Sequence, residues 1–213
     1  IIYAASSSCY GLTPSKSVNE EYKISTLYPY SFSKNAGEQA VLHWSKVYGI
    51  NYISLRLFNV YGPRSRTTGA YGAVMGVFLK QKLSNKPLTI VGNGKQKRDF
   101  VNVDDVVEVF IKSCFSKVKN QIFNVGTGKP KSINYLANLI GGRKIFIPKR
   151  PGEPFNSKAN VNKIKRLLRW KPKIKFERGI DELLKNINYW KSAPLWNKKN
   201  IKKATEIWFK NLK

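Results

Sequence analysis

The sequence contains very few of the residues that cross-link small proteins or bind metals. Among its 213 residues there are only two cysteines and one histidine. Cys9 and Cys114 form no CxxC pair, and no histidine stands at metal-ligand spacing from either. These absences exclude a disulfide framework, predict no metal site, and favour a reducing, cytoplasmic environment.

Long hydrophobic runs are also missing. No stretch approaches the roughly 18 unbroken apolar residues of a membrane-spanning helix, and no secretory leader is recognisable. We therefore expect a protein that has no membrane partner and is not exported. Its length and its hydrophobic content of 42% suffice for one substantial core, or for one core and a small second lobe.

Acidic residues are scarce. Twelve Asp and Glu stand against 39 Lys and Arg, which gives a formal charge of +27. Such a surface attracts nucleic acids, acidic lipids or phosphorylated small molecules without specifying which. The lysines are scattered and no known nucleic-acid module accompanies them. We interpret the charge as a solvated surface and expect no nucleic-acid partner, while a basic nucleic-acid-binding fragment stays as the rival hypothesis.

Segments with strand and helix patterns alternate along most of the chain. Apolar runs and alternation predict strands within 1–11, 51–63, 86–94 and 121–128. Helical spacing predicts helices at 31–49, 73–84, 103–115, 132–142, 160–170, 179–190 and 201–212. Ser132 is a plausible N-cap, and Gly49 and Gly141 are plausible helix stops. This alternation favours a parallel α/β sheet.

Tyr30 and Lys34 stand four residues apart at the start of a predicted helix, so both side chains project from one face. A phenol with a pKa of about 10 is a poor base at neutral pH, but a nearby ammonium group lowers that pKa. The pair can therefore take a proton from a sugar hydroxyl. Ser6, at the end of the first predicted strand, can bind the reacting oxygen, because parallel sheets place ligands at carboxyl ends of strands. Alone, this spacing equally suits an exposed tyrosine and a surface lysine.

Six ordered motifs resemble those of the extended short-chain dehydrogenase/reductase family, specifically its nucleotide-sugar epimerases of the UDP-galactose 4-epimerase type. They are YAASSSCYG at 3–11, PYSFSK at 29–34, RLFNVYGPR at 56–64, GNGKQKRDFVNVDDV at 92–106, FNVGTG at 123–128 and RPGEP at 150–154. The resemblance implies an NAD-dependent enzyme that inverts C4 of a UDP-hexose through a transient 4-keto sugar. It also implies a UDP-sugar substrate and a homodimer in the full-length form.

The resemblance also assigns roles to individual positions. The catalytic hydroxyl falls on Ser6, with Ser7 as the alternative alignment, the catalytic base on Tyr30 and the ribose-binding lysine on Lys34. Phe58 joins Tyr30 and Lys34 in the cofactor site. The substrate-binding positions implied in the same way are Ser6, Asn59, Thr89, Val91, Arg98, Arg150, Glu153 and Ser157.

Two arginines and one glutamate correspond to contacts with the nucleotide. Arg98 and Arg150 match diphosphate-binding positions, where a bidentate guanidinium suits phosphate oxygens. Glu153 stands where the family usually has an Asp that holds the ribose hydroxyls. The ordinary alternatives are that Arg98 pairs with Asp99 and that Asn59 caps a turn.

Three serines inform the choice of reaction and substrate. Related 4,6-dehydratases carry an Asp-Glu pair beside the catalytic hydroxyl, because elimination of water needs an additional acid and base. Ser7 and Ser8 occupy those places, and the Glu of decarboxylating relatives is missing, which favours epimerisation. Ser157 occupies a position that limits the space around the sugar C2 substituent, so N-acetylated sugars should fit. Another dehydratase or reductase of the family, or a binding remnant without turnover, is the alternative.

The GxxGxxG fingerprint of dinucleotide-binding folds is absent, and GNGK and GTGK are interpreted as turns. We expect an α/β fold made of the C-terminal part of a Rossmann-type parallel sheet and a smaller α/β substrate-binding lobe. Residues 1–63 should be the remainder of the NAD-binding domain, 64–190 mostly the lobe with at least one segment returning to the sheet, and 191–213 a helical tail. Alone, this chain should hold NAD weakly and be inactive.

Overall fold

A computed structural model describes residues 1–13, 16–65, 74–149 and 152–211, except for the side chain of Trp208. The chain forms two compact units that interleave along the sequence. Unit 1 comprises Ile1–Val60, Arg98–Pro130 and Pro154–Lys173. Unit 2 comprises Tyr61–Lys97, Lys131–Glu153 and Ile174–Lys213. The domain boundaries expected from the sequence stay a prediction.

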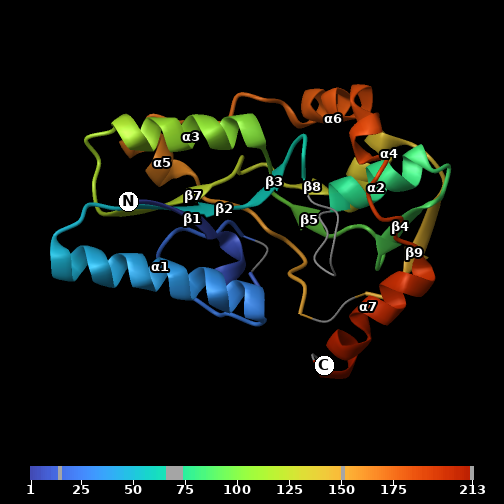
Figure 1. Ribbon diagram of the computed structural model, residues 1–213, viewed down its shortest axis with the longest axis horizontal. Helices are drawn as coiled ribbons and strands as arrows, with labels where there is room; N and C mark the ends of the chain where they lie inside the picture. Colours follow the sequence, from blue (N-terminus) through green and yellow to red (C-terminus); the bar gives the residue numbers. More distant parts are fainter. Residues whose placement is uncertain (14–15, 66–73, 150–151, 212–213) are drawn as a thin grey trace. The chain divides into compact units, whose positions relative to one another are not determined.

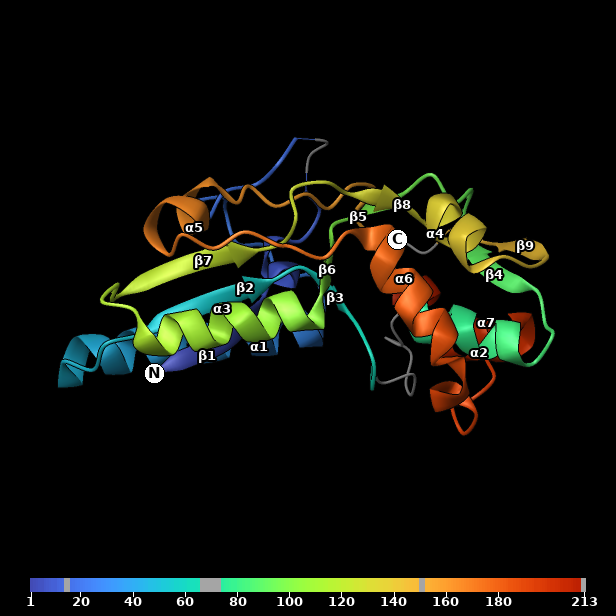
Figure 2. The same cartoon turned by 90° about the horizontal axis from the view of Figure 1, so that it is seen from above.

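Unit 1 is built on a parallel sheet of three strands. In spatial order these are β1 (Ile2–Ser6), β2 (Ile53–Leu57) and β7 (Gln121–Val125). The register pairs Ser6 with Leu57 and Leu57 with Val125, so the three strands end together. Figure 2 shows them side by side and pointing the same way. This parallel arrangement confirms the predicted α/β fold class.

Helices cover both faces of this sheet. They are α1 (Pro29–Tyr48) and α3 (Val103–Phe115), on opposite faces in Figure 1, and α5 (Asn162–Leu167), which contacts β7. Leu55 and Phe123 from the sheet and Val109 from α3 are fully buried in one hydrophobic cluster. Burial of each such side chain contributes about 1.5–3 kcal/mol. The core therefore fixes the strands whose ends carry the candidate site.

Local signals at both ends explain the position of α1. Pro29 occupies its first turn, where a missing N–H costs nothing. The Ser31 hydroxyl satisfies the backbone of Tyr28 at the start of the helix. It accepts from the Tyr28 N–H at 3.2 Å and donates to the Tyr28 carbonyl at 2.7 Å. Gly49 ends the helix with φ of 66°, the left-handed conformation that favours glycine. The predicted helix and its stop are confirmed.

The apolar stripe that predicted α1 lies on its exposed side. Trp44 is 57% exposed and Val47 72% exposed, whereas Ser31, Glu38 and Ser45 are buried. The side of α1 that meets the sheet is therefore polar, and it carries a buried carboxylate. Apolar spacing correctly predicted a helix, but the stripe is not what packs against the sheet.

Unit 2 contains a two-stranded parallel sheet with helices around it. Its strand pair is β4 (Leu88–Val91) and β9 (Lys144–Ile147). Its helices are α2 (Val74–Leu83), α4 (Ile133–Ile140), α6 (Phe176–Lys185), the 3₁₀ helix η2 (Ile187–Trp190) and α7 (Lys198–Asn211). The short elements that remain are η1 (Ser7–Tyr10), β3 (Asn59–Tyr61), β5 (Lys97–Arg98), β6 (Phe100–Asn102) and β8 (Lys131–Ser132).

Several local predictions can be compared with unit 2 directly. The Ser132 hydroxyl accepts from the Tyr135 N–H and Gly141 ends α4, as predicted. The single helix predicted over 179–190 is wrong in its bounds: α6 starts at Phe176 and ends at Lys185, because the chain tightens at Asn186 into η2. Strand β9 was not predicted.

Candidate functional site

Ser6 ends β1 and is the N-cap of η1. The amide and the hydroxyl of Ser8 both donate to Ser6 Oγ, at 3.2 and 2.9 Å. A hydroxyl has one O–H donor and two acceptor lone pairs. Because both lone pairs of Ser6 are engaged, its own O–H is left as its means of binding another oxygen. Ser7, the alternative alignment, takes no part in this pair of bonds.

Lys34 lies against the carboxyl-terminal half of β1. Its Nζ donates to the Ala4 carbonyl at 3.0 Å and lies 5.8 Å from the ring centroid of Tyr3. The Tyr3 hydroxyl donates in turn to the Lys34 carbonyl at 3.2 Å. Tyr30, one turn earlier on α1, is 46% exposed. The structure therefore brings the start of α1 next to the strand that ends in Ser6.

Two further predicted residues follow β2 at the same edge of the sheet. The Phe58 N–H donates to the Val125 carbonyl at 2.9 Å, and its ring is buried in the core. Asn59 comes next, with an exposed side chain and an N–H that donates to the Asp99 carbonyl at 3.0 Å. Since strands β1 and β2 end in register, Ser6 and Asn59 both lie at this carboxyl edge. The binding roles of Phe58 and Asn59 stay predictions.

Asp99 organises the loop after β7. Its carboxylate accepts from the Thr127 N–H and hydroxyl at 2.7 and 2.6 Å, and from the N–H groups of Gly128 and Ala159, each at 2.9 Å. Burial raises the Asp99 pKa above its ordinary value, although these hydrogen bonds oppose the change. The GTG segment thus binds a carboxylate of the same chain within a turn, as its interpretation as a turn predicted.

Arg98 and Ser157 belong to unit 1. Arg98 Nη1 donates to the Pro154 carbonyl at 2.8 Å, which ties this guanidinium to the segment that includes Ser157. The carboxylate of neighbouring Asp99 is occupied by the loop contacts described above. Ser157 itself is half-buried. This contact links Arg98 to a segment far away in the sequence, and the binding roles of Arg98 and Ser157 stay predictions.

The other predicted binding residues lie in unit 2 or outside the described ranges. Thr89 is buried on β4, where its Oγ1 accepts from Gln81 Nε2 at 2.8 Å. Val91 ends the same strand and Glu153 ends the second segment of unit 2. Arg150 lies outside the described residues. The binding roles of these four residues stay predictions.

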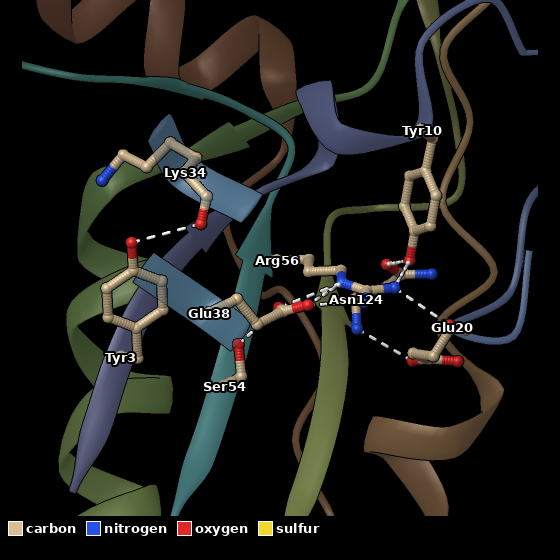
Figure 3. A network of polar contacts seen from close by, with 8 residues as sticks. All are labelled: Tyr3, Tyr10, Glu20, Lys34, Glu38, Ser54, Arg56 and Asn124. Carbon is tan, nitrogen blue, oxygen red and sulfur yellow. Dashed lines mark hydrogen bonds and ion pairs between the residues drawn. The ribbon is translucent and has the colours of Figure 1, made fainter. Parts of the chain in front are cut away.

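Beneath the carboxyl edge lies a buried polar network that the sequence did not reveal (Figure 3). Arg56 of β2 is only 3% exposed and pairs with Glu38 of α1, which is 1% exposed, with an Nη2 to Oε1 distance of 2.6 Å. Arg56 Nη1 also donates to the Tyr10 hydroxyl at 3.0 Å and to the Glu20 carbonyl at 2.9 Å. Ser54 Oγ donates to Glu38 Oε2 at 2.7 Å. One guanidinium therefore contacts three separate segments.

The pKa shifts in this network follow from its burial and its charges. Burial would lower the Arg56 pKa, but the Glu38 hydrogen bonds and the neighbouring charge outweigh it and raise that pKa. Burial raises the Tyr10 pKa, and the Arg56 charge only partly opposes the change. Arg56 is therefore charged and the Tyr10 phenol neutral throughout the physiological range.

Two sequence signals could have revealed the network. Arg56 stands between Leu55 and Leu57 in a strand whose other residues are uncharged, and Glu38 stands one turn after Lys34 on the same side of α1. A charge in a buried strand requires a partner. Neither signal identifies Glu38 as the partner of Arg56, because the two residues are 18 apart in the sequence and belong to different elements.

The two cysteines should differ sharply in reactivity. Cys9 is buried in η1, and burial raises its pKa to about 11, whereas Cys114 is exposed on α3. Because the thiolate is the reactive form, a thiol reagent such as DTNB at pH 8 should label one cysteine in the native chain and both after denaturation. Replacement of Cys114 by Ser should abolish the native signal. Rapid labelling of two thiols in the native chain would contradict this prediction.

Two other kinds of feature, a membrane-spanning helix and a metal-binding cluster, are absent from the described residues. Among the residues that the structure describes, no helix is both long and apolar enough to cross a bilayer. Within the same ranges, no group of three or more His, Cys, Asp or Glu side chains is placed to hold a metal ion. The polar groups at the carboxyl edge of the unit 1 sheet therefore form the candidate functional site.

Known relatives align with most of this chain. The "Putative UDP-glucose 4-epimerase" of Methanocaldococcus jannaschii is 36% identical over 191 residues, which cover 86% of this chain and 61% of that protein. The UDP-glucuronic acid 4-epimerase of Bacillus cereus, solved with UDP-glucuronic acid and NAD, is 30% identical with a TM-score of 0.80. It is matched over 90% of this chain and 61% of its own chain. The chain thus spans less than two thirds of the length of these proteins.

A second solved structure and a family model also match this chain. The UDP-N-acetylglucosamine 4-epimerase of Methanobrevibacter ruminantium is 29% identical with a TM-score of 0.81, matched over 90% of this chain and 62% of its own. The model described as "NAD dependent epimerase/dehydratase family" matches residues 1–126, which include Ser6, Tyr30 and Lys34. These findings confirm the resemblance drawn from the motifs, and the chain belongs to the NAD dependent epimerase/dehydratase family.

Proposed function

We propose that this chain carries the catalytic residues of an NAD-dependent enzyme that inverts C4 of a UDP-hexose. The observation that carries the proposal is that Ser6 ends β1 and that Lys34, near the start of α1, donates to the Ala4 carbonyl of the same strand. The UDP-sugar 4-epimerases among its relatives support the reaction class. Family dehydratases and reductases are the alternative class.

The hydrogen bonds around Ser6 suggest how it acts. With two donors from Ser8 on its oxygen, Ser6 donates its own O–H to the sugar O4. A second group must then accept the O4 proton, and the phenol of Tyr30 is the proposed acceptor. The roles divide between the two residues: Ser6 orients O4 and Tyr30 moves the proton.

Lys34 suits the ribose of a dinucleotide. An ammonium group has three N–H donors, and the contact with the Ala4 carbonyl leaves donors for ribose hydroxyls. NAD, when bound, accepts and returns the C4 hydride. Tyr30, Lys34 and Phe58 are the proposed NAD contacts from this chain.

The test is direct. The polypeptide encoded by the complete reading frame is incubated with UDP-glucose, UDP-galactose and their N-acetylated forms, and C4 inversion is followed by proton NMR. Conversion of at least one pair, in both directions and without loss of sugar, supports the proposal. Elimination of water, decarboxylation, or tight DNA binding without any response to UDP would contradict it.

Ser157 should control the size of the sugar. A small side chain at this half-buried position leaves room for an N-acetyl group, so UDP-GalNAc should be accepted. Ser157→Tyr should lower kcat/KM for UDP-GalNAc by about 10-fold or more, while UDP-galactose in the same variant serves as the control. A parallel loss for both sugars, or a wild-type preference for the unacetylated sugar that survives the change, would refute this assignment.

The exposed stripe of α1 is the proposed dimer contact. Phe32, Trp44, Val47 and Tyr48 lie along one side of the helix and are all exposed. Trp44→Glu should convert a dimer into a monomer in sedimentation equilibrium of the complete polypeptide, because it buries a charge in an apolar contact. Lys46→Glu, at an exposed position of α1 outside this stripe, changes more charge and should leave the dimer intact. Equal dissociation by both variants would refute the stripe as the contact.

A further inference from the structure

We propose that Arg56 is a positioning residue, which holds the Ser6 turn and the Tyr30–Lys34 start of α1 in one fixed geometry. The inference rests on the proposed function and extends it to residues that touch neither substrate nor cofactor. It is carried by the buried contacts of Figure 3. All of these contacts lie within unit 1.

Arg56 holds α1 through the carboxylate of Glu38. Arg56 Nε donates to both carboxylate oxygens of Glu38 at 3.1 Å, and its Nη2 donates to Oε1. Glu38 stands one turn after Lys34 and two turns after Tyr30 on the same helix. Between these turns, Gly37 packs so closely on the Tyr3 ring that an added Cβ would lie 2.1 Å from its hydroxyl. Helix α1 therefore has little freedom to slide along β1.

Arg56 holds the turn after β1 through the hydroxyl of Tyr10. Tyr10 ends η1, the short helix that Ser6 caps, and its side chain is 1% exposed. Its hydroxyl accepts from Arg56 Nη1 and donates to Asn124 Oδ1 at 2.7 Å. Since η1 has only four residues, fixing Tyr10 at one end constrains Ser8 and Ser6 at the other.

The chemistry of arginine suits this task. Its planar guanidinium presents donors in a fixed fork, so it can bind a carboxylate on one side and a phenol on the other at set angles. Burial strengthens such hydrogen bonds and makes a partly satisfied network costly. The distance between Ser6, which donates a hydrogen bond to O4, and Tyr30, which accepts the O4 proton, is thus set by one buried side chain of β2.

The Tyr10 hydroxyl is the specific link, and Ser54 provides a matched control. Tyr10→Phe keeps the buried ring, over which the Arg56 guanidinium lies, but removes the hydrogen bond between Arg56 and η1. Ser54→Ala removes one buried hydrogen bond of the same network, to Glu38 Oε2, at a site with no contact to η1. Each variant leaves the Arg56–Glu38 pair in place.

The experiment measures both variants in the complete polypeptide. Tyr10→Phe should lower kcat for C4 inversion about 10- to 100-fold with little change in KM, because a small misplacement of reacting groups is costly. Ser54→Ala should retain kcat within about twofold, although it should lose about as much thermal stability as Tyr10→Phe. Equal kcat losses in the two variants, or no loss in Tyr10→Phe, would overturn the inference.

A second measurement is independent of any activity. Amide hydrogen exchange in the 213-residue chain should speed up at Ser8 and Gly11, the amides that close the η1 turn, in Tyr10→Phe but not in Ser54→Ala. Unchanged exchange in Tyr10→Phe would overturn the positioning role even if the enzyme is active. An inactive wild type with the expected exchange pattern would instead count against the proposed function alone.

Discussion

Tyr30→Phe should reduce kcat for C4 inversion about 10²- to 10⁴-fold, the range that general acid–base catalysis contributes. The variant removes only the hydroxyl that is proposed to accept the O4 proton and keeps the ring. Tyr30 is 46% exposed, so the loss of its hydroxyl should leave the free energy of unfolding unchanged. Because the Ser6 oxygen is already saturated with donors from Ser8, Ser6 is poorly placed to take over as the base.

The matched control is Tyr189→Phe. It removes the same phenol oxygen from an exposed side chain of η2. Its kcat should equal that of the wild type. Residual activity above a tenth of the wild-type value in Tyr30→Phe would contradict the assignment.

The parts of the fold that the sequence predicts well depend on local chemistry. Gly49 ends α1 because its backbone adopts positive φ, and Ser132 begins α4 because its hydroxyl caps an amide three residues later. Such signals act within one turn and can be read directly. The same holds for β1, where an apolar run ends in the hydroxyl of Ser6.

The contacts that organise the site are not local, which is why the sequence does not reveal them. Arg56 binds Glu38 and Tyr10, which come from a helix and a turn far away in the chain, and its register in the sheet decides which of them it meets. Asp99 likewise gathers Thr127 and Ala159. Periodicity can indicate that a charge is buried, but only tertiary packing selects its partner.

Helix α1 illustrates the same difference. Its apolar spacing predicts a helix correctly, yet the buried side is formed by Ser31, Glu38 and Ser45. A polar side can be buried here because Ser54 and Arg56 of β2 satisfy the carboxylate of Glu38. The apolar side, with Trp44 and Val47, then remains exposed.

Glu38→Gln should cost the largest amount of stability of any single change in unit 1 that removes no core volume. The variant is nearly isosteric but leaves the buried Arg56 guanidinium without its carboxylate. Removing one partner of a buried pair typically lowers the free energy of unfolding by about 3–5 kcal/mol. Urea unfolding of the 213-residue chain, followed by circular dichroism, measures this loss.

The control uses the same substitution in an exposed ion pair. Arg178 Nε and Glu182 Oε1 lie 3.0 Å apart on α6, with side chains 76% and 44% exposed, so Glu182→Gln should cost at most about 1 kcal/mol. The double variant Glu38→Met with Arg56→Met should lose less stability than Glu38→Gln, because no charge is then left buried. Equal losses in Glu38→Gln and Glu182→Gln would mean that water reaches Arg56. The guanidinium would then be too mobile to fix the distance between Ser6 and Tyr30.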